Sequence, residues 1–189
     1  MPKHYYYMSE HKMTMEENAA EYDYKHDKKD QCKKHDKKDR KKDRSKLVEF
    51  AYEISNPIVT SIPLTFPLST QPQVVATATL KDVEKGNVVW LNGLYHVNNN
   101  SPEFADLYTR IYRGTISPGN LIYQSIVEID AEGNDDATES VTQFVDVIPA
   151  DAQNVTYFLT AQKGPFSEDL NVFAYGPITF TATEIKQED

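Results

Sequence analysis

From residue 47 onward, the chain consists of short segments in which apolar and polar residues alternate. The segment VEFAYEI at 48–54 is the first of them, with an apolar residue at every second position. A period of two is typical of a β-strand with one buried side. Similar segments rich in Val, Thr, Ile and aromatic residues recur at 74–80, 88–97, 107–113, 121–129, 141–147, 155–161, 172–175 and 178–185.

The stretches between these segments are rich in turn-forming residues. Ser117-Pro118-Gly119-Asn120 is typical of a hairpin connection, residues 131–139 form a polar acidic loop, and Gly176-Pro177 predicts a further stop. No part of residues 47–189 shows the 3.6-residue apolar repeat of an amphipathic helix. We therefore predict an all-β fold, a jelly-roll sandwich of about 8–10 antiparallel strands.

The first 46 residues have a different composition. His26-Asp27-Lys28-Lys29-Asp30 recurs as residues 35–39, and from Lys25 to Lys46 the only hydrophobic residue is Cys32. Such a segment buries too little apolar surface to offset the ~1–2 kcal/mol per residue that backbone ordering costs. We predict two parts: a disordered polyampholyte tail at 1–46 and a β-sandwich domain at 47–189.

Charge divides along the same boundary. Residues 1–46 hold 14 of the 20 Lys and Arg and 10 of the 29 Asp and Glu, a net charge of +4, which leaves −13 on residues 47–189. An acidic domain repels nucleic acid and anionic membranes, and the interleaved aspartates of the tail cancel most of its attraction for phosphate. We expect neither partner. The N-terminus lacks the apolar region of a signal peptide, so we expect synthesis in a cytoplasm.

Residues with catalytic potential are sparse in the domain. His96 is its one histidine, lies within a strand segment and has no nucleophile motif beside it. We predict an ordinary strand residue there, no catalytic residue, no cofactor and no enzymatic activity. Trp90, Tyr95 and Tyr108 are candidates for a binding site, with packing in the core or between subunits as the favoured alternative.

Metal binding has two weak candidates. The acidic residues from Asp130 to Asp136 suggest calcium, but their spacing departs from a calcium loop, so a solvated hairpin tip is favoured. His26, Cys32 and His35 match no standard zinc site. Cys32 is instead a candidate for an intermolecular disulfide crosslink. The tyrosines of the tail are candidate assembly contacts: Tyr5, Tyr6, Tyr7, Tyr22 and Tyr24.

Several strand phrases resemble those of the exosporium protein C family of spore-forming Bacillus-type bacteria. They are DLYTRIYRG at 106–114, IYQS at 122–125, VTQFVDV at 141–147, VTYFLTA at 155–161 and GPITFTATEI at 176–185. The resemblance covers about residues 47–185. It implies a jelly-roll domain that packs as trimers or larger arrays, in a protein made in the mother-cell cytoplasm and assembled into the exosporium or coat. It supplies no catalytic residues.

Two functions follow as hypotheses. The first is a non-catalytic structural or assembly protein of a bacterial spore surface layer, in which the domain packs into a homo-oligomer beside other spore-surface proteins and the tail tethers or crosslinks. The alternative is a jelly-roll binding module that recognises a carbohydrate or a protein partner.

Overall fold

The structure is a computed structural model, and it describes residues 45–56, 59, 61, 66–131 and 137–187. The candidate residues of the tail, from Tyr5 to His35, lie outside this range, as does most of the acidic loop at 132–136. The described residues form eight strands and two short 3-10 helices. The strands are β1 (Lys46–Ser55), β2 (Gln73–Val83), β3 (Val88–Asn99), β4 (Ala105–Arg113), β5 (Leu121–Ile129), β6 (Thr138–Val147), β7 (Ala152–Lys163) and β8 (Val172–Lys186).

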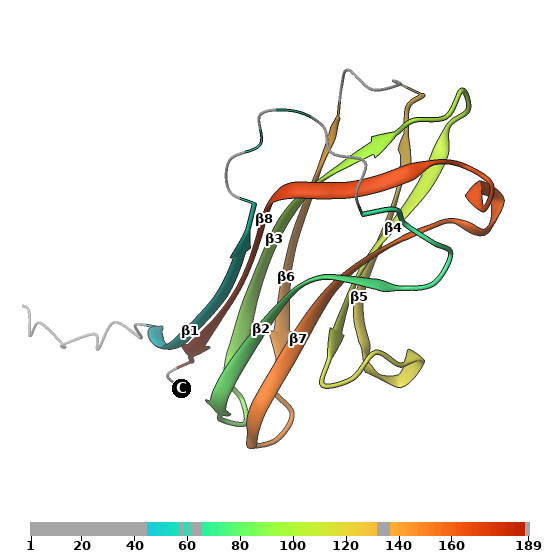
Figure 1. Cartoon of the computed structure of the whole chain (residues 1–189). Helices are drawn as coiled ribbons and strands as arrows, with labels where there is room; N and C mark the ends of the chain where they lie inside the picture. Colours follow the sequence, from blue (N-terminus) through green and yellow to red (C-terminus); the bar gives the residue numbers. More distant parts are fainter. Residues whose placement is uncertain (1–44, 57–58, 60, 62–65, 132–136, 188–189) are drawn as a thin grey trace, which may run out of the picture. The chain divides into compact units, whose positions relative to one another are not determined.

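The strands form two four-stranded antiparallel sheets, in the orders β1-β8-β3-β6 and β2-β7-β4-β5 (Figure 1). Each strand of the first half pairs with its counterpart counted from the other end: β1 with β8, β2 with β7, β3 with β6 and β4 with β5. A long antiparallel hairpin rolled into two sheets gives this order, which is the jelly roll. The predicted all-β jelly-roll fold is confirmed.

The core lies between the two sheets. Its largest buried apolar side chains include Phe180 and Leu91 from one sheet and Leu159 and Ile111 from the other. Burying each contributes on the order of 1.5–3 kcal/mol. The two sheets approach each other closely at Gly93, where a Cβ atom would lie 2.9 Å from Leu159 Cδ2. A glycine at this position therefore lets the two layers meet.

One polar chain crosses the core. The Tyr95 hydroxyl lies 2.5 Å from Thr109 Oγ1, which lies 3.2 Å from Ser140 Oγ. Burial raises the pKa of Tyr95 above its usual value near 10, because the phenolate would lose its water. Tyr95 therefore packs in the core with its hydroxyl satisfied, as the favoured alternative predicted.

The last strand corrects the predicted boundaries. Residues 172–175 and 178–185 were expected to be two strands separated by Gly176-Pro177, but they form the single strand β8. Pairing with β3 shifts register between Leu94 and His96, opposite this dipeptide. A bulge tolerates a residue that lacks an N–H, so Pro177 does not end the strand. The connection predicted at Ser117–Asn120 does separate two strands, β4 and β5.

Candidate interaction surface

Strand β1 presents its apolar side away from the core. Phe50, Tyr52 and Ile54 are 51%, 62% and 55% exposed, whereas Glu49 and Glu53 point toward the other sheet. The alternation at 48–54 correctly predicted a strand, but its apolar side was expected to be the buried one. That expectation is wrong, because the inward side is used for hydrogen bonds.

The two inward carboxylates bind the free edge of β2. Glu53 Oε2 accepts hydrogen bonds from the Thr77 backbone N–H at 2.5 Å and from Thr77 Oγ1 at 3.0 Å. Glu49 accepts hydrogen bonds from the Lys81 N–H, at 3.1 and 2.9 Å to its two oxygens. β2 is an edge strand, so these N–H groups have no strand partner. The carboxylates thus join the edges of the two sheets and block further pairing there.

The outward side of β1 continues across the whole sheet. The registers between β1, β8, β3 and β6 align four outward residues in each of four rows. In row order these sixteen residues, which we call the uncharged face, are Leu47, Ile185, Val88 and Val147; Phe50, Thr183, Trp90 and Val145; Tyr52, Thr181, Asn92 and Gln143; and Ile54, Thr179, Leu94 and Val141.

None of these sixteen side chains carries a charge, although residues 47–189 together carry −13. Several are large and half exposed, among them Trp90 at 44% and Val145 at 52%. Four strands about 4.8 Å apart and eight residues long outline roughly 500 Å² of sheet. The face mixes apolar side chains with Thr, Asn and Gln, and its area matches the largest patch that a monomer usually exposes, about 300–600 Å², which is often functional. The uncharged face is therefore a candidate interface.

The two parts of β8 contribute unequally to this face. The second part of β8 contributes Thr179, Thr181, Thr183 and Ile185. The first part does not, because Val172, Ala174 and Tyr175 are buried. β1 and β6 provide most of the exposed apolar side chains, and their alternation alone does not indicate that the apolar sides point outward.

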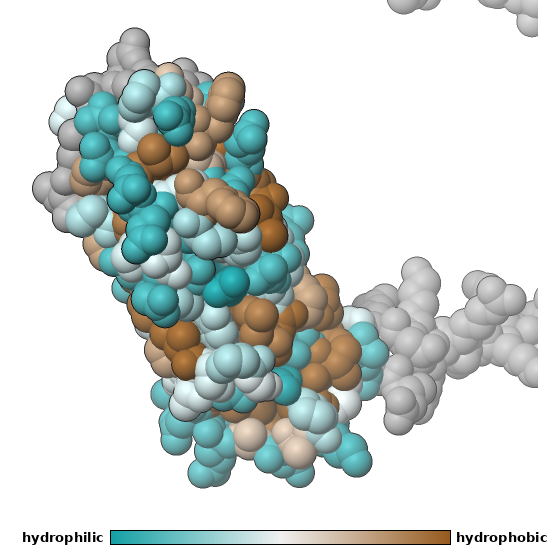
Figure 2. Space-filling view, turned by 90° about the vertical axis from the view of Figure 1, so that its right-hand side faces the viewer, coloured by the Kyte–Doolittle hydropathy of each residue, from teal (hydrophilic) through white to brown (hydrophobic). Residues whose placement is uncertain are grey.

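The other sheet has a different outer surface. Strand β4, one of the two inner strands of this sheet, places Tyr108 and Arg110 outward, whereas Tyr112 is buried beside Phe158 of β7. Hydrophobic and hydrophilic patches are interspersed on the side of the molecule where β4 and β5 lie (Figure 2). Trp90, Tyr95 and Tyr108 thus occupy three separate layers, namely one outer face, the core and the other outer face. They do not form one binding site.

His96 lies at the end of the uncharged face. Its Nδ1 atom is 3.4 Å from the Pro177 carbonyl oxygen, and its ring packs against Tyr175 with centroids 5.7 Å apart. These contacts are those of a packed strand residue, as predicted.

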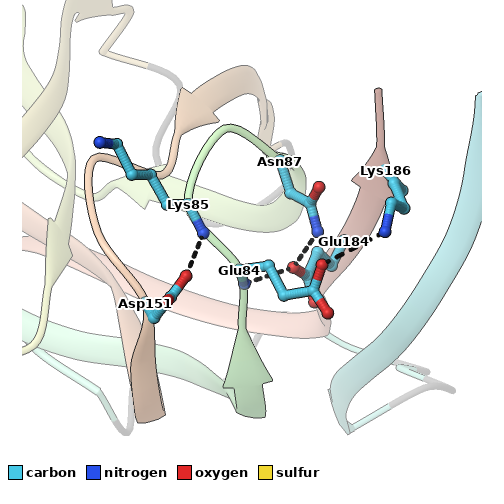
Figure 3. A network of polar contacts seen from close by, with 6 residues as sticks. All are labelled: Glu84, Lys85, Asn87, Asp151, Glu184 and Lys186. Carbon is cyan, nitrogen blue, oxygen red and sulfur yellow. Dashed lines mark hydrogen bonds and ion pairs between the residues drawn. The ribbon is translucent and has the colours of Figure 1, made fainter. Parts of the chain in front are cut away.

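Buried polar groups close one end of the sandwich. The Glu184 side chain is fully buried, and its Oε1 atom accepts hydrogen bonds from the Glu84 N–H at 3.0 Å and Asn87 Nδ2 at 2.7 Å (Figure 3). Lys85 N donates to Asp151, and Lys186 lies 3.5 Å from Glu84 (Figure 3). The network ties the β2–β3 turn to the end of β8, which is a structural role.

Two other kinds of site are absent from the described residues. No three His, Cys, Asp or Glu side chains there are arranged to hold a metal ion. No helix in the described part of the chain has the length and apolarity to cross a membrane.

Comparison with known proteins places the chain in no family. No protein-family model matches it, and neither does any curated protein. The resemblance to exosporium protein C therefore stays a prediction.

Solved structures show limited similarity. Those of the infectious bursal disease virus Gt and Gx strains match 75% and 77% of this chain, with TM-scores of 0.38 and 0.36 and sequence identities of 10% and 12%. The chain spans about a third, 32%, of each viral chain. A family 16 carbohydrate-binding module matches 65% of this chain and is matched over 73% of its own, with a TM-score of 0.22 and 16% identity. The fold assignment accordingly rests on the chain's own strand pairing.

Proposed function

We propose that this protein is a non-catalytic structural component of a bacterial spore surface layer, and that its sandwich assembles with further copies of itself through the uncharged face. The observation that carries the proposal is the row of β1, β8, β3 and β6 side chains, sixteen residues without a charge on a domain of −13. The spore setting is supported by the strand phrases that resemble exosporium protein C.

A second copy of the chain fits this face better than other partners do. Two acidic domains repel one another, and a contact through an uncharged surface keeps that repulsion smallest because it brings no like charges close together. A two-fold contact brings the same patch together from both copies, so that the two uncharged faces meet. At roughly 500 Å² of sheet, the patch would supply the greater part of the about 800 Å² of accessible surface that each partner buries in a standard interface. An anionic membrane is disfavoured by the acidic surroundings.

The tail then has a separate role. We propose that its tyrosines and Cys32, which precede the sandwich in the sequence, tether or crosslink the assembled layer.

The location is tested by fractionating purified spores and detecting the chain with an antibody. The proposal predicts that the protein remains with the exosporium or coat fraction after washing in salt, and that reducing agent increases its release. Recovery in the soluble mother-cell fraction alone would contradict the spore assignment, and it would leave self-association to be judged by a separate experiment.

A further inference from the structure

The sheet opposite the uncharged face holds a cationic side chain in an uncommon environment. Arg110 lies at the middle of β4, and its Nε donates to Gln124 Oε1 at 2.6 Å while its Nη1 donates to Gln162 Oε1 at 2.6 Å. The guanidinium carbon is 5.3 Å from the centre of the Tyr108 ring. Two neighbouring strands and one aromatic ring therefore fix the plane of this guanidinium.

The support beneath Arg110 is itself fixed. Gln162 is only 7% exposed, and its Nε2 donates to the Thr70 carbonyl oxygen at 3.0 Å. That bond directs the amide oxygen of Gln162 toward Arg110. A buried side chain with both amide atoms used holds its neighbour in one orientation, which lowers the entropy lost when a ligand binds.

The charge of Arg110 is left without a counterion. Both of its acceptors are neutral amides, and no described carboxylate lies within ion-pair distance of it. Arg113, three residues along the same strand, provides the contrast, since its Nη1 lies 2.9 Å from Asp146 Oδ2. A guanidinium has five N–H donors, and the two bonds to glutamine leave three of them for another acceptor.

A cleft of about 570 Å³ opens beside this guanidinium. Its wall includes Arg110, Tyr112, Gln71, Pro72 and Ser117, and Arg110 alone among the described lining residues carries a charge. The volume is within the range of small-ligand sites. Pro72, Pro118 and Leu121 add apolar groups to the lining, while Gln71 and Ser117 add an amide and a hydroxyl.

From this arrangement we propose that the cleft binds a carboxylate-bearing saccharide. The planar guanidinium matches a carboxylate through two parallel hydrogen bonds. The apolar lining suits the face of a sugar ring, and the amide and hydroxyl suit its hydroxyl groups. On a domain of net charge −13, the Arg110 guanidinium gives this cleft a local positive charge that attracts an anionic ligand. The proposal is independent of assembly, because the cleft lies on the opposite sheet from the uncharged face.

The test is calorimetric titration of the full chain with glucuronate, with glucose, acetate, inorganic phosphate and a short peptide with a free C-terminus as comparison ligands. We expect saturable binding of glucuronate, at least tenfold tighter than that of any comparison ligand. If glucose bound equally well, the carboxylate would play no part in recognition. If acetate or phosphate bound equally well, the cleft would be a general anion site. If the peptide bound more tightly, the ligand would be a peptide carboxylate and not a saccharide.

Two variants locate the binding in the cleft. Arg110→Gln should weaken glucuronate binding at least tenfold, and Ser117→Ala, in the connection outside the sheet, should weaken it about threefold without affecting strand packing. Lys81→Gln, which removes an exposed cation outside the cleft, is the matched control and should bind like the parent. Circular dichroism verifies that each variant is folded. Unchanged glucuronate affinity in a folded Arg110→Gln variant would overturn the proposal. So would unchanged glucuronate affinity in Ser117→Ala, if the parent also bound glucuronate no more tightly than the comparison ligands.

Discussion

Tyr157 and Asp146 form the most tightly connected polar pair in the core. The Tyr157 hydroxyl donates to Asp146 Oδ2 at 2.9 Å, and Arg113 binds both oxygens of the same carboxylate. Burial of the ring raises the pKa of Tyr157 well above its usual value near 10, and the negative charge of Asp146 and the hydrogen bond to it raise the pKa further. The phenol therefore keeps its proton in the folded state.

This pKa shift predicts a loss of stability in alkali. Above about pH 10 the unfolded chain releases the Tyr157 proton while the folded chain retains it, so the unfolded state binds fewer protons. The free energy of unfolding then falls with rising pH, by about 1.4 kcal/mol per pH unit for each such tyrosine, and is unaffected below pH 10. Urea unfolding between pH 8 and 11.5 measures this fall.

The matched variant for that measurement is Tyr157→Phe. It should show a shallower decline above pH 10 than the parent, with the remaining slope due in part to Tyr95, whose pKa is raised as well. If the variant and the parent decline equally, Tyr157 does not hold its proton in the folded state, and the role given to Asp146 is wrong.

At the scale of single elements, β1 has its polar side turned inward and its apolar side outward. Its inner carboxylates replace the strand that β2 lacks at its edge. The outer side chains are then left for a partner. Because the polar side of β1 faces inward, its large apolar side chains are about half exposed in the isolated chain.

Replacing Glu53 tests the inner half of this arrangement. Glu53→Ala leaves the Thr77 N–H and hydroxyl without their acceptor, and we expect it to lower the free energy of unfolding by about 1–3 kcal/mol. Glu53→Gln keeps an acceptor oxygen and should cost less than about 1 kcal/mol. Glu128→Ala removes an exposed carboxylate of β5 and is the control for lost charge. A Glu53→Ala effect no larger than that of Glu128→Ala would show that the bonds to β2 contribute nothing.

The strands themselves were largely predictable from the sequence. Period-two alternation and turn residues located all eight, with ends that differ mainly by a few residues, because these signals are local. The break at Gly176-Pro177 was mispredicted, since whether a proline ends a strand depends on a bulge in the pairing with β3. Which side of β1 faces inward was mispredicted as well. That depends on β2 having a free edge, which is a property of the topology and not of residues 46–55.

At the scale of the whole molecule, the two outer faces differ in chemistry. The β1-β8-β3-β6 face is uncharged and broad, whereas the β2-β7-β4-β5 face contains a cleft with an unpaired guanidinium. Neither face could be derived from the sequence, because each combines residues from strands that are far apart along the chain. Phe50 and Trp90, for example, are 40 positions apart in the sequence. They lie in one row because β8 pairs with both β1 and β3.

The central claim is that copies of this chain assemble through the uncharged face. Sedimentation velocity on the full chain in reducing buffer, where Cys32 forms no disulfide, tests it most directly. The parent should sediment as an oligomer. The variant Phe50→Glu with Trp90→Glu should sediment as a folded 21.6 kDa monomer, because like charges would face one another across the contact. Ile126→Glu, which adds a charge at an exposed apolar position of the other sheet, should assemble like the parent. A parent that stays monomeric at every concentration, or a folded double variant that assembles as the parent does, would contradict the claim.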